Sequence, residues 1–487
     1  MSTLPSIIAK FAESRQAKIA LAGLILLQVM ASIIWQSGDP NFLKVAGINI
    51  GDGPSYKNFS WSSIQEILGG HRNFGYPLFL KIVHGIFGTH EAVPVIQLSI
   101  YFLSIIVLFL TFFHFLPKYI YTAAVFCSFL IWHKPLFFYF NYILTEAPGA
   151  AFLNFSVALS VWAVCRKRWY CFLVLGVAVF FLFQVRTALA FACFLFPVWM
   201  AFLEWAEKRG MRSVWGTFGK ATLVTVLPLL AFAFLRLIVV GHLGITSLNG
   251  ILLSGHASFL YQEGDEKLLS GEAKKLGEMI IQRRQNLEPP CNQFFESIES
   301  ADYSALLHKR CYGPYVMSNW VAAIELIDKD KPFADDRNRE PWKHMPTLSG
   351  FFNRYSVPHD NLLKQYSIPI LRAHLEGYLK WVLEGGTLTI LIFAAAYSKT
   401  LFWILAGSIL FGFFIGRYGF SSKLEGAVFF VLVGFSFFVL STGPVLLLNT
   451  VFVRFLELHS LYLFPAIALL VLCFFALIGE RWAPAKK

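Results

Sequence analysis

Charged residues are scarce in this chain of 487 residues: Asp, Glu, Lys and Arg together make up 14% of it, whereas hydrophobic residues make up 56%. Because soluble domains carry about 25% charged residues, this shortage excludes an ordinary soluble protein. The chain also lacks the alternating segments, each about ten residues long, that build a transmembrane β-barrel. The composition therefore predicts an all-α polytopic membrane protein, and its 51 Phe and 13 Trp suit lipid-facing and interfacial positions.

Nucleotide and metal motifs are also missing. The sequence contains no H-E-x-x-H, no C-x-x-C, no P-loop and no G-x-G-x-x-G, so a cytoplasmic nucleotide or nucleotide sugar is poorly supported as a direct substrate. No metal site and no cofactor are indicated, and a requirement for a divalent ion is left open. The net charge of +12 comes largely from Lys and Arg clusters beside apolar segments, which indicates membrane topology and not binding to nucleic acid.

Cysteine is rare in the polar parts of the sequence. Five of the seven cysteines lie in or beside apolar runs, where cysteine behaves as a small buried hydrophobic residue. Only Cys291 and Cys311 lie in polar sequence. We expect a disulfide between them if their segment faces an oxidising compartment. The alternative is a reduced pair, or a pair too far apart to bridge.

The chain does contain a series of apolar segments of membrane length. The first, 19–35, follows three basic residues and lacks an A-x-A cleavage site, so we expect an uncleaved span with its N-terminus in the cytoplasm. Further spans are expected at 93–116, 119–132, 143–164, 170–183, 188–203 and 221–240. The positive-inside rule places the basic run 166–168 in the cytoplasm. The first loop, 36–92, then faces outward, with a short apolar piece at 76–87 that is expected to lie in the interface.

These segments divide the chain into three parts. An N-terminal transmembrane module (1–240) is followed by polar sequence at 241–377, which is expected to form an outward-facing mixed soluble loop or domain with an amphipathic stretch at 271–285. A C-terminal transmembrane module (378–487) contains further apolar runs at 388–397, 401–415, 428–440 and 461–477. Depending on whether Lys399 marks a turn, the expected total is about 10 to 11 transmembrane helices.

Ionisable residues gather beside the membrane boundaries of the outward face. The first loop holds Asp39, Asp52, His71 and Arg72, and such groups are costly beside a bilayer unless they are paired, solvated or used. Asp52 is a candidate general base for an acceptor hydroxyl, and Asp39 is the alternative. Asp52 also suits the cap of a helix that begins at the next proline. A solvated loop of turns is the alternative interpretation of the whole stretch.

Other ionisable residues lie at the mouths of later spans. Arg72, Arg186 and Arg454 are candidates for binding a phosphate, because guanidinium binds phosphate oxygens in a fork. For Arg72 and Arg186 the alternative is snorkelling to lipid headgroups, and for Arg454 it is pairing with Glu457 or near His459. Glu146 opens a span without a basic residue close by in sequence, so it must find a partner in the fold. His71 is a candidate second acid or base, and the alternative is a neutral, solvated loop histidine.

The order of these residues resembles the GT-C glycosyltransferases that use polyprenyl-phosphate donors, especially the branch with protein mannosyltransferases and the lipid A aminoarabinose transferase. In that family the first outward loop carries an acidic residue, often followed by Tyr, then an Arg and a Gly-Tyr-Pro-like segment. The matching residues here are Asp52, Tyr56, Arg72 and Gly75-Tyr76-Pro77, followed later by Thr145-Glu146, Arg186-Thr187 and Arg454-Phe455. The resemblance covers about the first 240 residues and the C-terminal span. Family members often have two adjacent acidic residues where Gly53 follows Asp52, which leaves Asp39 as a rival.

The resemblance implies a GT-C-like fold and an inverting glycosyltransferase. It would move a hexose or pentose from a polyprenyl-phosphate donor to a glycan, lipid or protein acceptor, on the outward face of a bacterial inner membrane, in cell-envelope polysaccharide biosynthesis. The implied site consists of Asp52 as base, Arg72, Arg186 and Arg454 at the donor phosphate, and Tyr56, His71, Tyr76 and Glu146 as further site residues. Two alternatives are an O-antigen or polysaccharide polymerase or ligase, which uses a diphosphate-linked donor, and a polysaccharide transporter or flippase, although no internal repeat is found.

Overall fold

The computed structural model describes residues 15–39, 42–44, 53–117, 120–132, 140–206, 210–262, 264–287, 291, 305–327 and 357–379. These ranges form helices and connecting loops, and no strand occurs within them. Of the expected features, the last four apolar runs, Asp52 and Arg454 lie outside the described residues. The expected total number of spans therefore stays a prediction.

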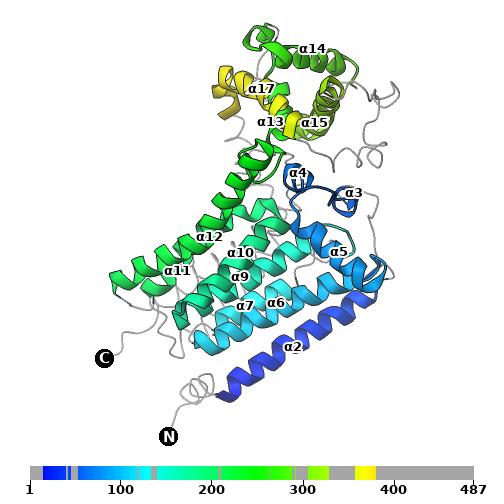
Figure 1. Cartoon of the computed structure of the whole chain (residues 1–487). Helices are drawn as coiled ribbons and strands as arrows, with labels where there is room; N and C mark the ends of the chain where they lie inside the picture. Colours follow the sequence, from blue (N-terminus) through cyan, green and yellow to red (C-terminus); the bar gives the residue numbers. More distant parts are fainter. Residues whose placement is uncertain are drawn as a thin grey trace.

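The N-terminal module is a bundle of apolar helices (Figure 1). Its members are α2 (Arg15–Ser37), α6 (Val93–Phe115), α7 (Ile120–Ile131), α9 (Glu146–Arg166), α10 (Trp169–Val185), the 3₁₀ helix η2 (Thr187–Phe191), α11 (Ala192–Ala206) and α12 (Met211–Val240). In the described part of the chain, five segments are long and apolar enough to cross a membrane: Ile19–Ser37, Val93–Phe115, Glu146–Arg166, Thr187–Trp205 and Met211–Val240. The protein is therefore membrane-embedded and, over the described ranges, all-α.

Three expected spans differ from the helices that form. The segment expected at 119–132 appears as α7, which has 12 residues and is too short to cross a bilayer alone. The segment expected at 188–203 begins as the tighter helix η2 before α11. Helix α12 begins at Met211 instead of 221, because a membrane helix can continue through the polar residues that flank its apolar run.

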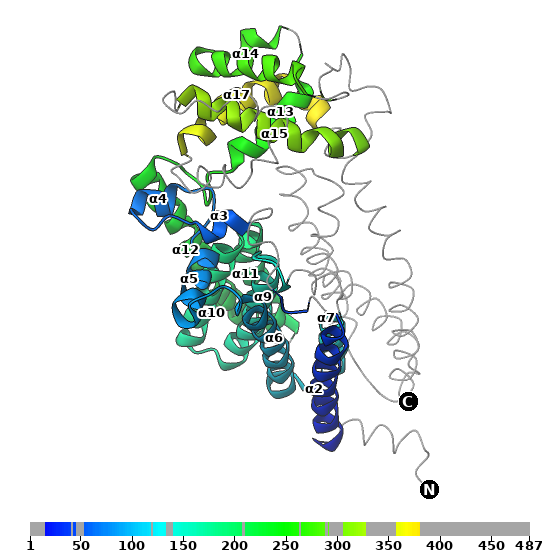
Figure 2. The same cartoon turned by 90° about the vertical axis from the view of Figure 1, so that its right-hand side faces the viewer.

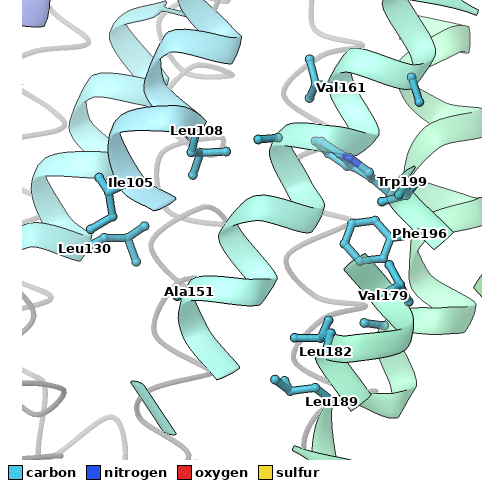
Figure 3. Packing of buried hydrophobic residues seen from close by; sticks show 14 of the residues in the cluster. Ile105, Leu108, Leu130, Ala151, Val161, Val179, Leu182, Leu189, Phe196 and Trp199 are labelled. Atoms are coloured by element: carbon cyan, nitrogen blue, oxygen red, sulfur yellow. The ribbon is translucent and has the colours of Figure 1, made fainter. Parts of the chain in front are cut away.

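The bundle is held together by interlocking apolar side chains and a few polar contacts between helices. Figure 3 shows side chains from α6, α7, α9, α10 and α11 packed against one another, including Leu108, Leu130 and Phe196. Asn154 Nδ2 donates to Ser104 Oγ at 3.1 Å, which joins α9 to α6. Within lipid, the hydrophobic effect does not drive helices together, because the lipid tails are as apolar as the helices. Such packing and hydrogen bonding therefore decide which helices associate.

The two ends of the bundle are formed by different polar contacts. At one end Lys167 Nζ lies 2.6 Å from Glu204 Oε1 and donates to Ser213 Oγ at 2.8 Å. These contacts join the last residues of α9 and α11 to the start of α12, in the region of the basic run 166–168. The first loop lies at the opposite end of the bundle, close to the end of α12; the side of the membrane that each end faces stays a prediction.

The first loop folds into three short helices: α3 (Gly53–Lys57), α4 (Ile64–Gly69) and α5 (Gly75–Phe87). Helix α4 begins with a capping bond, in which Ser63 Oγ accepts the backbone N–H of Glu66 at 3.2 Å. Helix α5 buries Leu80 and leaves Ile82 and Ile86 exposed. With 13 residues, it suits the expected interfacial position better than a span.

The polar part of the chain, which we call the polar domain (residues 241–379), is helical where it is described. It contains α13 (Asn249–Leu260), η3 (Asp265–Leu268), α14 (Gly271–Gln285), α15 (Ala305–Ile327) and α17 (Val357–Ala373). Most of their buried apolar residues form a second hydrophobic core, whereas Val357, the first residue of α17, packs in the core of the bundle. Figures 1 and 2 show α3 and α4 between this domain and the bundle, so the first loop lies where the two modules meet.

A disulfide crosses the polar domain. Cys291 and Cys311 are bonded, with their Cα atoms 5.3 Å apart. Tyr315 Oη donates to the backbone carbonyl of Cys291 at 2.8 Å, so the bond lies against the first half of α15. A stable bond of this kind requires an oxidising compartment.

Candidate functional site

Arg72 lies against the short helix α3. Its Nε donates to Ser55 Oγ at 3.1 Å and its Nη1 donates to Tyr56 Oη at 3.2 Å. The guanidinium carbon is 4.8 Å from the centre of the Tyr56 ring, which adds a cation–π contact. The side chain is only partly buried. The first loop therefore fixes one cation in a defined direction and leaves part of it accessible.

Tyr76 connects this loop to the bundle. Its ring meets the Tyr56 ring edge-on, with 5.0 Å between the ring centres, and its hydroxyl donates to Gln97 Oε1 of α6 at 3.1 Å. Tyr76 has no exposed surface. Burial, and after it the neighbouring Tyr56 and Glu146, raises the pKa of the Tyr76 phenol, so this group remains a protonated donor. The sequence placed Tyr76 in the site but gave no sign of Gln97.

Glu146 finds its partner in Arg186, the extended residue between α10 and η2. Glu146 Oε1 lies 2.8 Å from Arg186 Nη1, which also donates to Thr145 Oγ1 at 2.8 Å. Both charged side chains are largely buried. The carboxylate is in the first turn of α9, where the helix dipole favours a negative charge. The charge of Arg186 thus balances that of Glu146, and its expected contact with a donor phosphate stays a prediction.

His71 is buried between the first loop and the polar domain. Only 4% of its surface is exposed, and its ring meets Trp320 of α15 edge-on at 5.8 Å between ring centres. The interpretation of His71 as a solvated loop residue is therefore wrong. Sequence reasoning missed Trp320, because the contact joins positions far apart in the chain.

The two candidate bases differ in position. Asp39 is exposed in the turn that follows α2. Asp52 directly precedes Gly53, the first residue of α3, and lies outside the described residues. Of the site residues predicted from the sequence, the structure brings Tyr56, Arg72, Tyr76, Glu146 and Arg186 together, and it places His71 against the polar domain.

A buried arginine connects the first loop to the segment that joins α12 to the polar domain, which we call the joint (residues 236–247). Arg236, near the end of α12, donates to the Leu68 carbonyl of α4 at 2.7 Å, to the Gly244 carbonyl at 2.9 Å and to Ser247 Oγ at 2.6 Å. Only 1% of its surface is exposed. No sequence pattern selects Arg236, because it occurs within an expected span. Its contacts fix α4 relative to the polar domain.

Just beyond this joint, Asp360 of α17 gathers several donors. Its Oδ2 lies 2.8 Å from His242 Nε2 and 2.7 Å from Lys364 Nζ, and its Oδ1 accepts the backbone N–H of Gly250 at 2.6 Å. A Cβ atom at Gly250 would come within 2.0 Å of the Asp360 carbonyl oxygen, so only glycine allows this approach of α13 to α17. Asp360 is fully buried and holds the polar domain together at its base.

The carboxylate of Asp360 predicts an acid limit to stability. Burial alone raises its pKa, but the hydrogen bond from His242 and the charge and hydrogen bond of Lys364 outweigh it, so the pKa lies below its usual value. A lowered carboxyl pKa contributes stability above the unfolded value of about 4, which is lost as the pH falls through the folded value. Asp360→Asn is expected to lower the thermal unfolding temperature at pH 7. Between pH 5 and 3, the unfolding temperature of this variant should decrease less steeply than that of the wild type.

Unfolding followed by tryptophan fluorescence at a series of pH values checks this prediction. Glu272→Gln, which removes an exposed carboxylate of α14, is the control and should keep the pH dependence of the wild type. An Asp360→Asn profile parallel to that of the wild type would contradict it.

The described residues contain no group of three or more His, Cys, Asp or Glu side chains that could hold a metal ion. The chain matches no family model, no curated protein and no solved structure.

Proposed function

We propose that this protein is an inverting glycosyltransferase that moves a sugar from a polyprenyl-phosphate donor to a glycan, lipid or protein acceptor on the outward face of a bacterial inner membrane. One observation carries the proposal. Residues from three parts of the chain meet at the end of the bundle opposite the basic run: Tyr56 and Tyr76 of the first loop, Glu146 at the start of α9, and Arg186 after α10. A partly exposed arginine, Arg72, is fixed at the edge of this cluster.

The proposed mechanism assigns one step to each group. Asp52 takes the proton from the acceptor hydroxyl as its oxygen attacks the anomeric carbon of the sugar. The bond between that carbon and the phosphate oxygen breaks on the opposite side, so the configuration inverts and polyprenyl phosphate leaves with an additional negative charge. Arg72 stabilises this charge as it develops. Arg186 contributes by holding Glu146, and the lipid chain lies among the apolar helices.

The position of the cluster supports a lipid-linked donor. The phosphate of such a donor lies at the membrane boundary while its chain stays in the bilayer, and Arg72 lies against α3, three residues before α5, the helix expected in the interface. The disulfide requires an oxidising compartment for the polar domain, and the joint of Arg236 places that domain beside the first loop. The reaction would then occur on the side away from cytoplasmic nucleotides.

The test is transfer by the purified protein in lipid vesicles. Polyprenyl phosphates that carry mannose, glucose or arabinose are offered with glycan, lipid and peptide acceptors, and polyprenyl phosphate is measured as the product. Arg72→Gln is expected to lower kcat/KM by about 10- to 100-fold, because a hydrogen bond to a charged group is lost. Lys81→Gln, which removes an exposed cation of α5 over Trp61, is the matched control and should act like the wild type.

The other outcomes identify the competing functions. Movement of a glycolipid between the leaflets without bond formation would favour a transporter or flippase. Transfer from diphosphate-linked donors alone would favour a polymerase or ligase. Equal activity of Arg72→Gln and Lys81→Gln would contradict the role assigned to Arg72.

A further inference from the structure

Gln184, in the last turn of α10, is a buried glutamine with an unsatisfied amide. Its side chain has no exposed surface, and among the described residues neither its Oε1 nor its Nε2 has a hydrogen-bond partner. Buried amides are nearly always hydrogen-bonded, because leaving one unsatisfied is costly. Glu146 shows the same feature within the described chain: its Oε1 binds Arg186, whereas its buried Oε2 has no hydrogen-bond partner.

Both unsatisfied groups lie beside the first turn of α5. A Cβ atom at Gly75 would come within 2.6 Å of the Gln184 carbonyl carbon, so the start of α5 rests directly on Gln184. Asn73 Nδ2 donates to the carbonyl of Phe183, which fixes the preceding turn to the same end of α10. Tyr76, the next residue of α5, is close enough to Glu146 to respond to its charge. The same turn continues backwards to Arg72.

We propose that Gln184 binds the sugar of the donor through hydrogen bonds to its hydroxyl groups. This inference rests on the proposed function and adds the residue that selects the sugar. An amide offers two donor hydrogens and one acceptor oxygen, and a sugar hydroxyl both donates and accepts, so one side chain can satisfy adjacent hydroxyls. The turn that begins α5 connects Arg72 to the residues packed on Gln184, so the sugar on a phosphate bound at Arg72 would lie beside this turn. Because Gln184 has no exposed surface, the proposal requires the turn to move aside when the sugar binds. Glu146 Oε2 provides a second acceptor at this position.

If Gln184 binds the sugar, removing its amide should affect stability and sugar binding in opposite directions. Gln184→Met keeps the length of the side chain and removes the unsatisfied amide, so we expect the variant to unfold at a higher temperature than the wild type. We also expect it to bind sugar-bearing polyprenyl phosphate about tenfold more weakly. Its affinity for polyprenyl phosphate without sugar should not change, because Arg72 is intact.

Gln97 provides the matched control. It is equally buried, but its amide is satisfied: Oε1 accepts from Tyr76, and Nε2 donates to the carbonyls of Phe140 and Tyr142. Gln97→Met should therefore lower the unfolding temperature. The opposite signs of the two substitutions distinguish an amide kept for a ligand from one that supports the fold.

The experiment measures binding of polyprenyl phosphate, with and without mannose, glucose or arabinose, to wild type and both variants by tryptophan fluorescence. The expected result is tighter binding of one sugar form by the wild type and loss of that preference in Gln184→Met. A Gln184→Met variant that keeps the preference, or that loses affinity for both lipids equally, would overturn the inference while leaving the proposed function. Failure of the wild type to bind either lipid would overturn the proposed function and this inference with it.

Discussion

Replacing Asp52 with asparagine is expected to lower the rate of sugar transfer by about 10² to 10⁴ while the protein still inserts and folds. The amide is similar in shape but cannot take the proton from the acceptor hydroxyl, and a positioned general base contributes about this factor. Asp52 directly precedes α3, whose Ser55 and Tyr56 accept hydrogen bonds from Arg72. The proposed base is therefore three and four residues in sequence from the two side chains that contact Arg72, the group proposed to bind the leaving phosphate.

Asp39→Asn is the matched control, because Asp39 is the rival carboxylate and is exposed in the turn after α2. Both variants are compared with the wild type in single-turnover transfer, with binding of sugar-free polyprenyl phosphate as a check of folding. Loss in Asp52→Asn alone supports the proposed mechanism. Loss in Asp39→Asn alone would transfer the role to Asp39, and full activity in both would remove an aspartate base from the first loop.

Much of the fold follows from the pattern of apolar residues, because lipid requires long helices wherever the chain crosses it. The sequence correctly predicted a span at 93–116, observed as α6, and an amphipathic segment at 271–285, observed as α14. The sequence-based bounds were wrong where a helix end is set by hydrogen bonds and turns and not by hydropathy. Helix α9 begins only at Glu146, because the preceding residues turn to carry contacts such as that from Gln97 to Tyr142.

The candidate site was only partly predictable. The sequence selected Glu146 and required a partner for it, but the partner lies after α10, and only the fold identifies it as Arg186. The contact of His71 with Trp320 depends on how the polar domain meets the bundle, which no local pattern records. Gln184 and Arg236 have no motif. Only the fold shows their importance: Gln184 is buried with an unsatisfied amide, and Arg236 is buried with three hydrogen bonds.

Replacing Arg186 with methionine is expected to lower the free energy of unfolding by about 3 to 5 kcal/mol, because it leaves the Glu146 carboxylate buried without its opposite charge. The double variant Arg186→Met with Glu146→Met should recover most of this loss, since it removes both charges together. The measurement is reversible unfolding in mixed detergent micelles, followed by tryptophan fluorescence.

The pair of Arg283 and Glu325 in the polar domain provides the control. It is a second ion pair in which the arginine is about as buried as Arg186 and the carboxylate is less buried than Glu146 (22% against 6% exposed), so Arg283→Met should cost less than Arg186→Met. If Arg186 instead binds the donor phosphate, Arg186→Met would weaken binding of sugar-free polyprenyl phosphate and leave stability nearly unchanged. A double variant as unstable as the single one would show that Glu146 is not what makes the loss of Arg186 costly. The two measurements together decide whether Arg186 positions Glu146 or contacts the donor itself.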